Sequence, residues 1–353
     1  MTEENPQNSY VFKELHDLEK TLKEAQLPED LKEKALSMLE RLNRMATFGG
    51  YSSEFEVISR YITWLVALPW FVESADNLEL AKAKEVLDAS HYGMDKVKER
   101  ILEFLSVLNL TLKQDKSVQA SVLCLIGMPG LGKTSVAMSI AESMGRKFVR
   151  VAMGGLGSAS QLRGLPKSVA NAEPGEIIKG LRRAGTKNPV ILLDEIDRVS
   201  ENARSDVMGV LLELLDPEQN NAFIDYYIDF PFDLSSALFI CSGNNTGGIA
   251  NAVLDRLEIL EMPSYTDEEK EVIGKSYLFP KALKEAGLSV EQLIIEDSLW
   301  STIIRPLGYD AGIRTLDRTI RGMTRKVAKK IVEGQGASFT ITPQNVKEFL
   351  PTW

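Results

Sequence analysis

The sequence predicts an α/β fold in which helices flank a parallel β-sheet and further helical segments precede and follow it. Three observations support this prediction. From residue 121 onward, short apolar runs alternate with stretches of helical patterning, which is typical of a parallel sheet. On either side of this central part, apolar residues recur at helical spacing. Finally, a glycine-rich loop joins the first apolar run to the helix after it.

Helices are expected throughout the N-terminal part of the chain. Pro28 divides the first stretch of helical periodicity into two helices, which we interpret as a solvated pair. A Gly/Ser turn at 48–53 precedes the third helix, and Pro69 follows it. The turn His91-Tyr92-Gly93 separates the last two helices. In chain order, the expected helices are two within Val11–Met45, one over Phe55–Leu68 and two within Leu78–Leu110.

The central and C-terminal parts complete the predicted fold. The runs expected as strands are Val122–Ile126, Phe148–Val151, Val190–Leu193 and Ala237–Cys241. After Pro263 the pattern is helical again as far as Glu333. The short run Phe339–Ile341 and a last helix over Gln344–Leu350 close the chain. We therefore expect a helical segment over 1–76, an α/β unit over 77–262 and a small helical unit over 263–353.

Composition narrows the class of protein. The 353 residues carry a net charge of −9, which disfavours a strongly basic nucleic-acid surface. Two cysteines in apolar runs and two histidines exclude a disulfide framework and a zinc ribbon, and we expect Cys124 and Cys241 to stay reduced. The segment Met1–Tyr10 lacks a secretory apolar core, and Trp64–Val72 is too short to span a bilayer. We therefore expect a cytoplasmic protein without a membrane segment.

The glycine-rich loop carries the most specific motif. It reads Gly-Met-Pro-Gly-Leu-Gly-Lys-Thr and fits G-x-x-x-x-G-K-[ST] between an expected strand and an expected helix. Glycines let backbone N–H groups point at phosphate oxygens, and the helix N-terminus adds positive potential. Lys133 can reach the β and γ phosphates, and the Thr134 hydroxyl can bind Mg²⁺. The expected phosphate-binding residues are Gly127, Met128, Pro129, Gly130, Leu131, Gly132, Lys133, Thr134 and Ser135.

Polar residues at the ends of two further strands support a nucleotide site. Asp194 and Glu195 directly follow an apolar run, and α/β sheets bind ligands at the carboxyl ends of their strands. Downstream of a phosphate loop, we expect Asp194 to help hold Mg²⁺ through water and Glu195 to act as general base on the attacking water. Asn244 follows the next run. It can bind that water or the γ-phosphate, although, taken by itself, an Asn there is better explained as an ordinary turn residue.

The ordered set of motifs resembles the AAA+ ATPases. The set comprises the phosphate loop, Leu-Leu-Asp-Glu ending at Glu195, the strand-end Asn244, Leu-Asp-Arg ending at Arg256 and Gly-Ile-Arg ending at Arg314. Further sequence segments resemble the ATPase module of the Lon family of ATP-dependent proteases. They are residues 91–93, 145–150, 184–190, 215–220 and 231–235. The resemblance extends from about residue 20 to the C-terminus.

The resemblance implies a fold, ligands, partners and residue roles. The fold is an AAA+ P-loop NTPase with a C-terminal helical lid, and the ligands are ATP and Mg²⁺. Asn244 would sense the γ-phosphate, and Arg314 would be a second sensor on the lid. Arg256 would be an arginine finger given to a neighbouring subunit, so hydrolysis would require a ring, usually a hexamer in this family. The turn His91-Tyr92-Gly93 would border the adenine.

Three departures from the family pattern bear on function. The chain ends at Trp353, where a Lon protein continues into its serine-lysine peptidase domain, so we expect no peptide cleavage by that chemistry. By the same resemblance, we expect the N-terminal substrate-recognition region to be missing except for its last helices. The loop expected to face a central pore reads Leu-Pro-Lys-Ser-Val-Ala-Asn, with Val169 where the family has an aromatic residue. Residues 204–207 read Arg-Ser-Asp-Val, where the family has Arg-Gly-Asp-Pro.

These features predict a Lon-type module that couples ATP hydrolysis to engagement, unfolding and translocation of polypeptide in a ring, within protein quality control. It is either the ATPase part of a protease, working with a peptidase domain or subunit, or a protease-less relative with a non-threading role; the sequence does not decide. Two alternatives remain. The basic stretch Arg318–Lys330 suggests a remodeller of nucleic acid, which the acidic composition disfavours. A scaffold without hydrolysis is disfavoured by the intact Glu195, Asn244 and Arg256.

Overall fold

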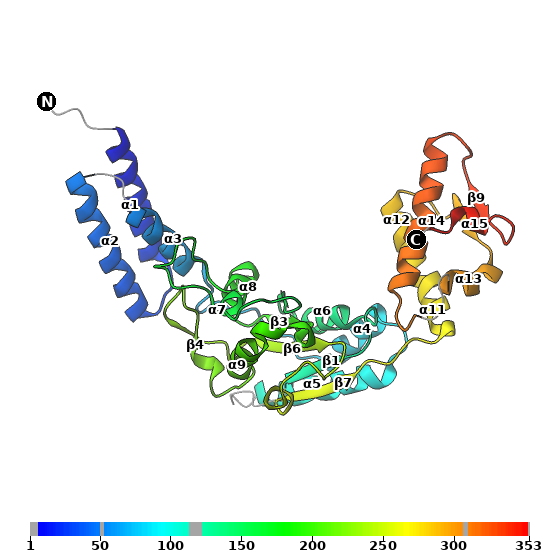
Figure 1. The fold of residues 1–353 in the computed structure, drawn as a ribbon, viewed down its shortest axis with the longest axis horizontal. Coiled ribbons are helices and arrows are strands. Elements are labelled where there is room, and N and C mark those ends of the chain that lie inside the picture. The colour runs from blue at the N-terminus through cyan, green and yellow to red at the C-terminus, as the bar shows by residue number, and fades with distance from the viewer. Residues whose placement is uncertain (1–5, 50–52, 113–121, 306–309, 352–353) are drawn as a thin grey trace.

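The computed structural model describes residues 6–49, 53–112, 122–305 and 310–351. The polar start of the chain and the turn expected at 48–53 fall partly outside these ranges, and Trp353 falls wholly outside. Figure 1 shows a group of helices at each end of the molecule and the β-sheet between them, as the sequence predicts. Within the described ranges, every helix is too short or too polar to cross a membrane.

The N-terminal helices pack onto the central part through the third of them. The described helices here are α1 (Pro6–Glu24), α2 (Glu29–Gly49) and α3 (Ser53–Ala67). Pro28 lies between α1 and α2, in the position where the sequence predicts a break. The Tyr61 hydroxyl of α3 donates to the Ile228 carbonyl oxygen at 2.8 Å, and the rings of Trp70 and Phe232 lie 4.9 Å apart. As a result, these helices share one hydrophobic core with one face of the sheet.

In the described residues, the central sheet has five parallel strands in the order β2-β3-β6-β1-β7. Their bounds are β1 (Val122–Ile126), β2 (Phe148–Ala152), β3 (Val190–Asp194), β6 (Leu238–Gly243) and β7 (Leu257–Glu261). All residues of β1, β3 and β6 are buried, which explains their continuous apolar sequences. The sequence does not predict β7, because two acidic residues interrupt the apolar ones in this edge strand and no apolar run forms.

Helices cover both faces of the sheet (Figure 1). On one face, α4 (Leu80–Ser90), α5 (Asp95–Leu112) and α6 (Lys133–Met144) pack on alternate strand residues such as Leu123 and Leu125. On the other face, α8 (Glu176–Ala184) and α9 (Arg204–Leu214) join the core that the N-terminal helices share. The remaining short elements are α7 (Ser160–Arg163), β4 (Phe223–Ile224), β5 (Pro231–Phe232) and α10 (Asn251–Leu254).

The C-terminal helices form a group with a core of its own. Its elements are α11 (Asp267–Ile273), the π-helical turn Gly274–Leu278, α12 (Phe279–Ala286), β8 (Leu293–Ile295), α13 (Trp300–Ile304), α14 (Arg314–Val332), β9 (Phe339–Ile341) and α15 (Val346–Phe349). A capping box starts α11: Glu269 N–H donates to the Thr266 hydroxyl and Thr266 N–H donates to the Glu269 carboxylate. The helical pattern expected after Pro263 is wrong at β8, since three residues are too few to show a strand period.

The two cysteines lie next to each other in the middle of the sheet. The register of β1 and β6 pairs Cys124 with Cys241, and both thiols are free. Burial raises the pKa of Cys124 to about 12 and also raises the pKa of Cys241. Both thiols therefore stay protonated and behave as small apolar side chains.

Candidate nucleotide-binding site

The glycine-rich loop between β1 and α6 has the backbone conformation that phosphate binding needs. Gly130 and Gly132 adopt φ angles of +85° and +89°, in the left-handed region that favours glycine. Gly132 is the residue directly before α6. The loop therefore turns sharply into the N-terminus of a long helix, where free N–H groups and the helix dipole favour an anion.

Lys133 and Asn244 meet beside this loop. The Lys133 ammonium is buried and donates to the carbonyl oxygens of Gly127 at 2.5 Å and Met128 at 3.1 Å, and to Asn244 Oδ1 at 3.3 Å. Burial lowers the pKa of Lys133, although the carboxylate of Asp194 opposes this effect. Asn244 Nδ2 is buried and has no hydrogen-bond partner in the described residues. A phosphate oxygen would satisfy both the ammonium and this amide, so the residues present fit a bound nucleotide.

Asp194 ends β3 at the same edge of the sheet and is buried. Both of its carboxylate oxygens have partners: the Ser242 hydroxyl donates to Oδ1, and Arg150 Nε donates to Oδ2 at 2.6 Å. Ser242 comes from β6 and Arg150 from β2, so the neighbouring strands on each side of β3 hold this carboxylate. The sequence alone predicts no role for either residue.

Glu195 differs from Asp194 in both backbone and environment. Its φ of +61° is in the left-handed region, which costs a non-glycine residue about 1–3 kcal/mol and is concentrated at functional sites. The Glu195 N–H donates to the Ser242 hydroxyl at 3.1 Å. Its side chain is 39% exposed and lies 3.6 Å from the Arg198 guanidinium. The acidic pair is thus divided into one buried carboxylate and one that water can reach.

The protein offers few direct ligands for a metal ion at this edge. No group of three or more His, Cys, Asp or Glu side chains that could hold a metal occurs in the described part of the chain. Mg²⁺ at phosphate-transfer sites takes only one or two ligands from protein and the others from phosphate and water. Thr134, at the start of α6, and Asp194 therefore suit Mg²⁺ that arrives with a nucleotide.

The turn His91-Tyr92-Gly93 lies between α4 and α5, close to the start of α6. His91 is buried, with Nδ1 2.8 Å from the Ser90 hydroxyl and Nε2 3.1 Å from the Ser135 hydroxyl. Ser135 already donates to the Gly132 carbonyl oxygen and Ser90 to the Val86 carbonyl oxygen, so each of these hydroxyls can accept from an imidazole N–H. Tyr92 is exposed. The turn is therefore linked to the phosphate loop through Ser135.

Acid should destabilise the fold through His91. Burial lowers its pKa from 6.5 to about 4. Between these values the unfolded chain binds more protons than the folded one, so the free energy of unfolding falls as pH drops, by up to about 3 kcal/mol. Urea unfolding at about pH 7 and about pH 5 should show a larger loss of stability in the native chain than in His91→Gln. An equal loss in both proteins would exclude His91 as the cause.

The C-terminal group of helices contacts the phosphate loop directly. The Ile313 N–H donates to the Gly130 carbonyl oxygen at 3.1 Å. A Cβ on Gly312 would lie 2.7 Å from the Pro129 oxygen, so the two backbones are packed closely. Arg314, the next residue, begins α14; its side chain is exposed and makes no hydrogen bond or ion pair to the described residues. This places Arg314 beside the loop with its guanidinium available.

Arg256 lies at the opposite edge of the sheet from the phosphate loop. It directly precedes β7, and its carbonyl oxygen accepts from the N–H of Val122, the first residue of β1. The loop follows the last residue of β1, about 17 Å away at about 3.3 Å per residue. The Arg256 guanidinium pairs with Asp216 at 3.2 Å. The structure therefore does not bring Arg256 to the other predicted site residues of its own chain.

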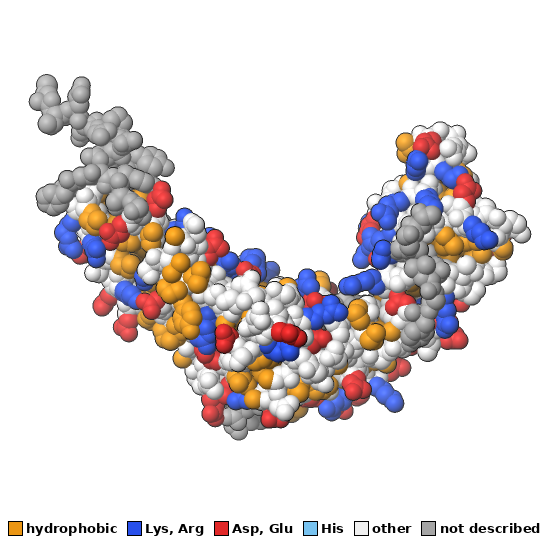
Figure 2. Space-filling view, in the orientation of Figure 1, with side chains coloured by type: hydrophobic (Ala, Val, Ile, Leu, Met, Phe, Trp, Pro, Cys, Tyr) orange, Lys and Arg blue, Asp and Glu red, His pale blue; other side chains and the backbone are white. Residues whose placement is uncertain are grey.

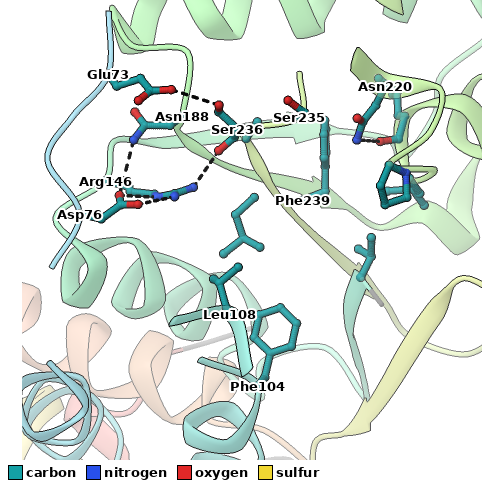
Figure 3. A pocket seen from close by; sticks show the side chains of 16 residues that line it. Glu73, Asp76, Phe104, Leu108, Arg146, Asn188, Asn220, Ser235, Ser236 and Phe239 are labelled. Carbon is teal, nitrogen blue, oxygen red and sulfur yellow. Dashed lines mark hydrogen bonds and ion pairs between the residues drawn. The ribbon is translucent and has the colours of Figure 1, made fainter. Parts of the chain in front are cut away.

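A separate cavity of about 180 Å³ also opens at this amino-terminal edge (Figure 3). Val122 and Leu238, the first residues of β1 and β6, line it. On its polar side, Arg146 forms a two-point ion pair with Asp76 and donates to the Ser236 carbonyl oxygen (Figure 3). None of the predicted nucleotide-binding residues lines this cavity. The cavity is therefore distinct from the candidate site.

Comparison with known proteins agrees with this geometry. Residues 123–264 match the family model described as "ATPase family associated with various cellular activities (AAA)", and residues 284–339 match the model "Lon protease AAA+ ATPase lid domain". The chain is 42% identical to Lon protease of Trichlorobacter lovleyi, 45% to Lon protease 1 of Bacillus subtilis and 45% to Lon protease of Dictyoglomus thermophilum.

These alignments include 96%, 96% and 91% of this chain, but 40%, 43% and 40% of the relatives. The chain thus spans about two fifths of the length of the curated relatives that it matches. The matched part contains the phosphate loop, the acidic pair and the helical group that contacts the loop. The chain therefore belongs to the Lon protease family, of which it carries the AAA+ ATPase module and its lid.

Proposed function

We propose that the chain binds and hydrolyses ATP, with the phosphates between the loop after β1 and the ends of β3 and β6. The unpartnered Asn244 amide beside the Lys133 ammonium is the observation that carries this proposal. Lys133 would exchange its loop carbonyls for phosphate oxygens, and Asn244 would orient the γ-phosphate or the attacking water. The exposed Glu195 would take a proton from that water. Thr134 and, through water, Asp194 would hold Mg²⁺, whose charge offsets that of the phosphates.

We further propose that hydrolysis takes place in a ring, in which Arg256 serves the nucleotide of a neighbouring subunit. The position of Arg256 supports this, because the length of β1 separates it from the loop of its own chain. The Asp216 pair would hold the guanidinium in place for the neighbour. An arginine supplied in trans stabilises charge that develops on the transferred phosphoryl group.

Phosphate release from ATP, measured over a range of chain concentrations, tests both proposals. The rate per chain should rise with concentration as rings form, and sedimentation velocity should show larger species under the same conditions. A complete lack of phosphate release in the assembled species would refute hydrolysis. A rate per chain that does not change between dissociated and assembled protein would refute the finger in trans.

The loop around Val169 supports a role in engaging polypeptide. The loop is closed at its base, where the Gly175 N–H donates to the buried Asp225 carboxylate at 2.7 Å. Val169 is 45% exposed. Lys167, by contrast, folds back with its ammonium 4.3 Å from the centre of the Tyr61 ring. We propose that an extended polypeptide contacts this loop in the ring through a small aliphatic side chain instead of an aromatic one.

Enlarging Val169 should strengthen coupling to unfolded protein. A valine offers several tens of Å² less apolar contact than an aromatic side chain. At about 25 cal/mol per Å², this weakens the contact of each subunit with polypeptide by about 1 kcal/mol. We expect casein to stimulate ATP hydrolysis weakly in the native chain and strongly in Val169→Tyr. The exposed Val290, in the C-terminal group, provides a matched control, because Val290→Tyr should leave stimulation unchanged. Strong stimulation of the native chain, equal to that of Val169→Tyr, would contradict this prediction.

Action on nucleic acid is not favoured by the arrangement of α14. Several basic side chains in this stretch already have acidic or carbonyl partners. Arg321 pairs with Asp317 and Glu285, and Lys330 pairs with Glu348. Lys326 donates to the carbonyl oxygens of residues 348 and 350. We therefore expect filter binding to DNA or RNA to be weak and to lack the steep salt dependence that several free phosphate contacts produce.

A further inference from the structure

Arg150 occupies a position from which it can control Asp194. Its Nε lies 2.6 Å from Asp194 Oδ2, and this contact joins a side chain that is 53% exposed to one that is 6% exposed. Arg150 belongs to β2, which is the edge strand of the sheet on this side. The guanidinium can therefore move toward solvent without disturbing the core, whereas the carboxylate cannot follow it.

The other oxygen of Asp194 is held from inside the sheet. The Ser242 hydroxyl donates to Oδ1 and also accepts from the Glu195 N–H, which fixes the carboxylate relative to the acidic pair. The Lys133 ammonium donates to two loop carbonyl oxygens and to Asn244, and not to Asp194. Among the described residues, Arg150 is thus the cation that forms a direct ion pair with Asp194.

We propose that Arg150 competes with the divalent metal for Asp194, pairing with it when the site is metal-free and releasing it when metal-bound nucleotide enters. A buried carboxylate without a positive partner is costly, so the exchange of one cation for another keeps Asp194 paired in both states. The guanidinium charge also repels an arriving Mg²⁺. This inference rests on the proposed nucleotide site. Arg150 is accordingly a positioning residue, which sets how strongly metal and nucleotide binding are coupled.

Affinity for mant-AMPPNP, a fluorescent ATP analogue that is not hydrolysed, tests the inference without any measurement of activity. The quantity compared is the dissociation constant in EDTA divided by that in saturating Mg²⁺. In Arg150→Gln this ratio should rise about five-fold, the upper end of what a half-exposed ion pair contributes. Arg150→Lys, which keeps the charge but loses the planar guanidinium, should give a smaller rise.

Arg198→Gln is the matched control. Arg198 is 54% exposed and pairs with Glu195, the neighbour of Asp194, so its removal changes the local charge equally but leaves the Asp194 pair intact. The inference is supported if the ratio of the two dissociation constants rises more in Arg150→Gln than in Arg198→Gln. An equal rise in both, no change, or a fall in Arg150→Gln would overturn it. Failure of the native chain to bind the analogue would instead refute the proposed nucleotide site.

Discussion

Replacing Glu195 by Gln is expected to slow ATP hydrolysis by about 10²–10⁴-fold and to leave ATP affinity nearly unchanged. The carboxylate is exposed to water and makes no hydrogen bond or ion pair with Lys133 or the loop glycines in the described structure, so in the proposed function it acts on the attacking water and not on the nucleotide. The amide of Gln keeps the size of the side chain and cannot accept a proton. Single-turnover phosphate release and equilibrium binding of an ATP analogue separate the two effects.

Lys133→Ala should instead lose ATP affinity. The ammonium faces the place proposed for the phosphates, beside the unpartnered Asn244 amide, so its loss removes binding itself. Hydrolysis then fails because the nucleotide does not bind. If Glu195→Gln and Lys133→Ala lose ATP affinity to the same extent, the assignment of different roles to these residues is wrong.

Arg256→Ala is expected to bind ATP normally and to hydrolyse it about 10³–10⁵-fold more slowly. Arg256 lies at the amino-terminal edge of the sheet, away from its own phosphate loop, so its loss leaves the binding site of its own chain intact. Lys281→Ala, in the helical group at the C-terminus, controls for the general loss of a positive charge. A comparable loss of activity in Lys281→Ala would show that the effect of Arg256→Ala is not specific to Arg256, which would contradict its role as an arginine finger.

Mixing two inactive variants tests whether the arginine acts between subunits. In a mixed ring, a Glu195→Gln subunit can offer an intact Arg256 to the complete site of a neighbouring Arg256→Ala subunit. Part of the activity should therefore return on mixing, in proportion to the fraction of such neighbours. No recovery in a mixture shown to assemble together would argue against a finger in trans.

The elements that the sequence predicts correctly are those whose signal is local. The buried strands β1 and β3 are continuous apolar runs, and the phosphate loop is a contiguous motif between a strand and a helix. By contrast, β7 at the sheet edge and β8 in the lid carry too few consecutive apolar residues to be recognised. Their place depends on the strands with which they pair, which no local pattern specifies.

The same distinction explains what the sequence could show of the site. Lys133 and Asp194 follow from the motif and from strand ends, but the link between Arg150 and Asp194 depends on the register of β2 against β3. Ser242 likewise reaches Asp194 only because β6 lies beside β3. Arg256 was identified from the family resemblance, but only the pairing of β1 with β7 shows that the length of β1 separates Arg256 from the phosphate loop of its own chain. Long-range pairing supplied these contacts.

Photolabelling with 8-azido-ATP, followed by mapping of the labelled peptides, tests the position of the nucleotide site most directly. We expect the label on the peptide that contains the His91-Tyr92-Gly93 turn or on those of the adjoining loop and lid, with unlabelled ATP preventing the reaction. Lys133→Ala should reduce the labelling strongly. Competable label on residues 235–239, which line the cavity at the other edge of the sheet, would contradict the proposed site.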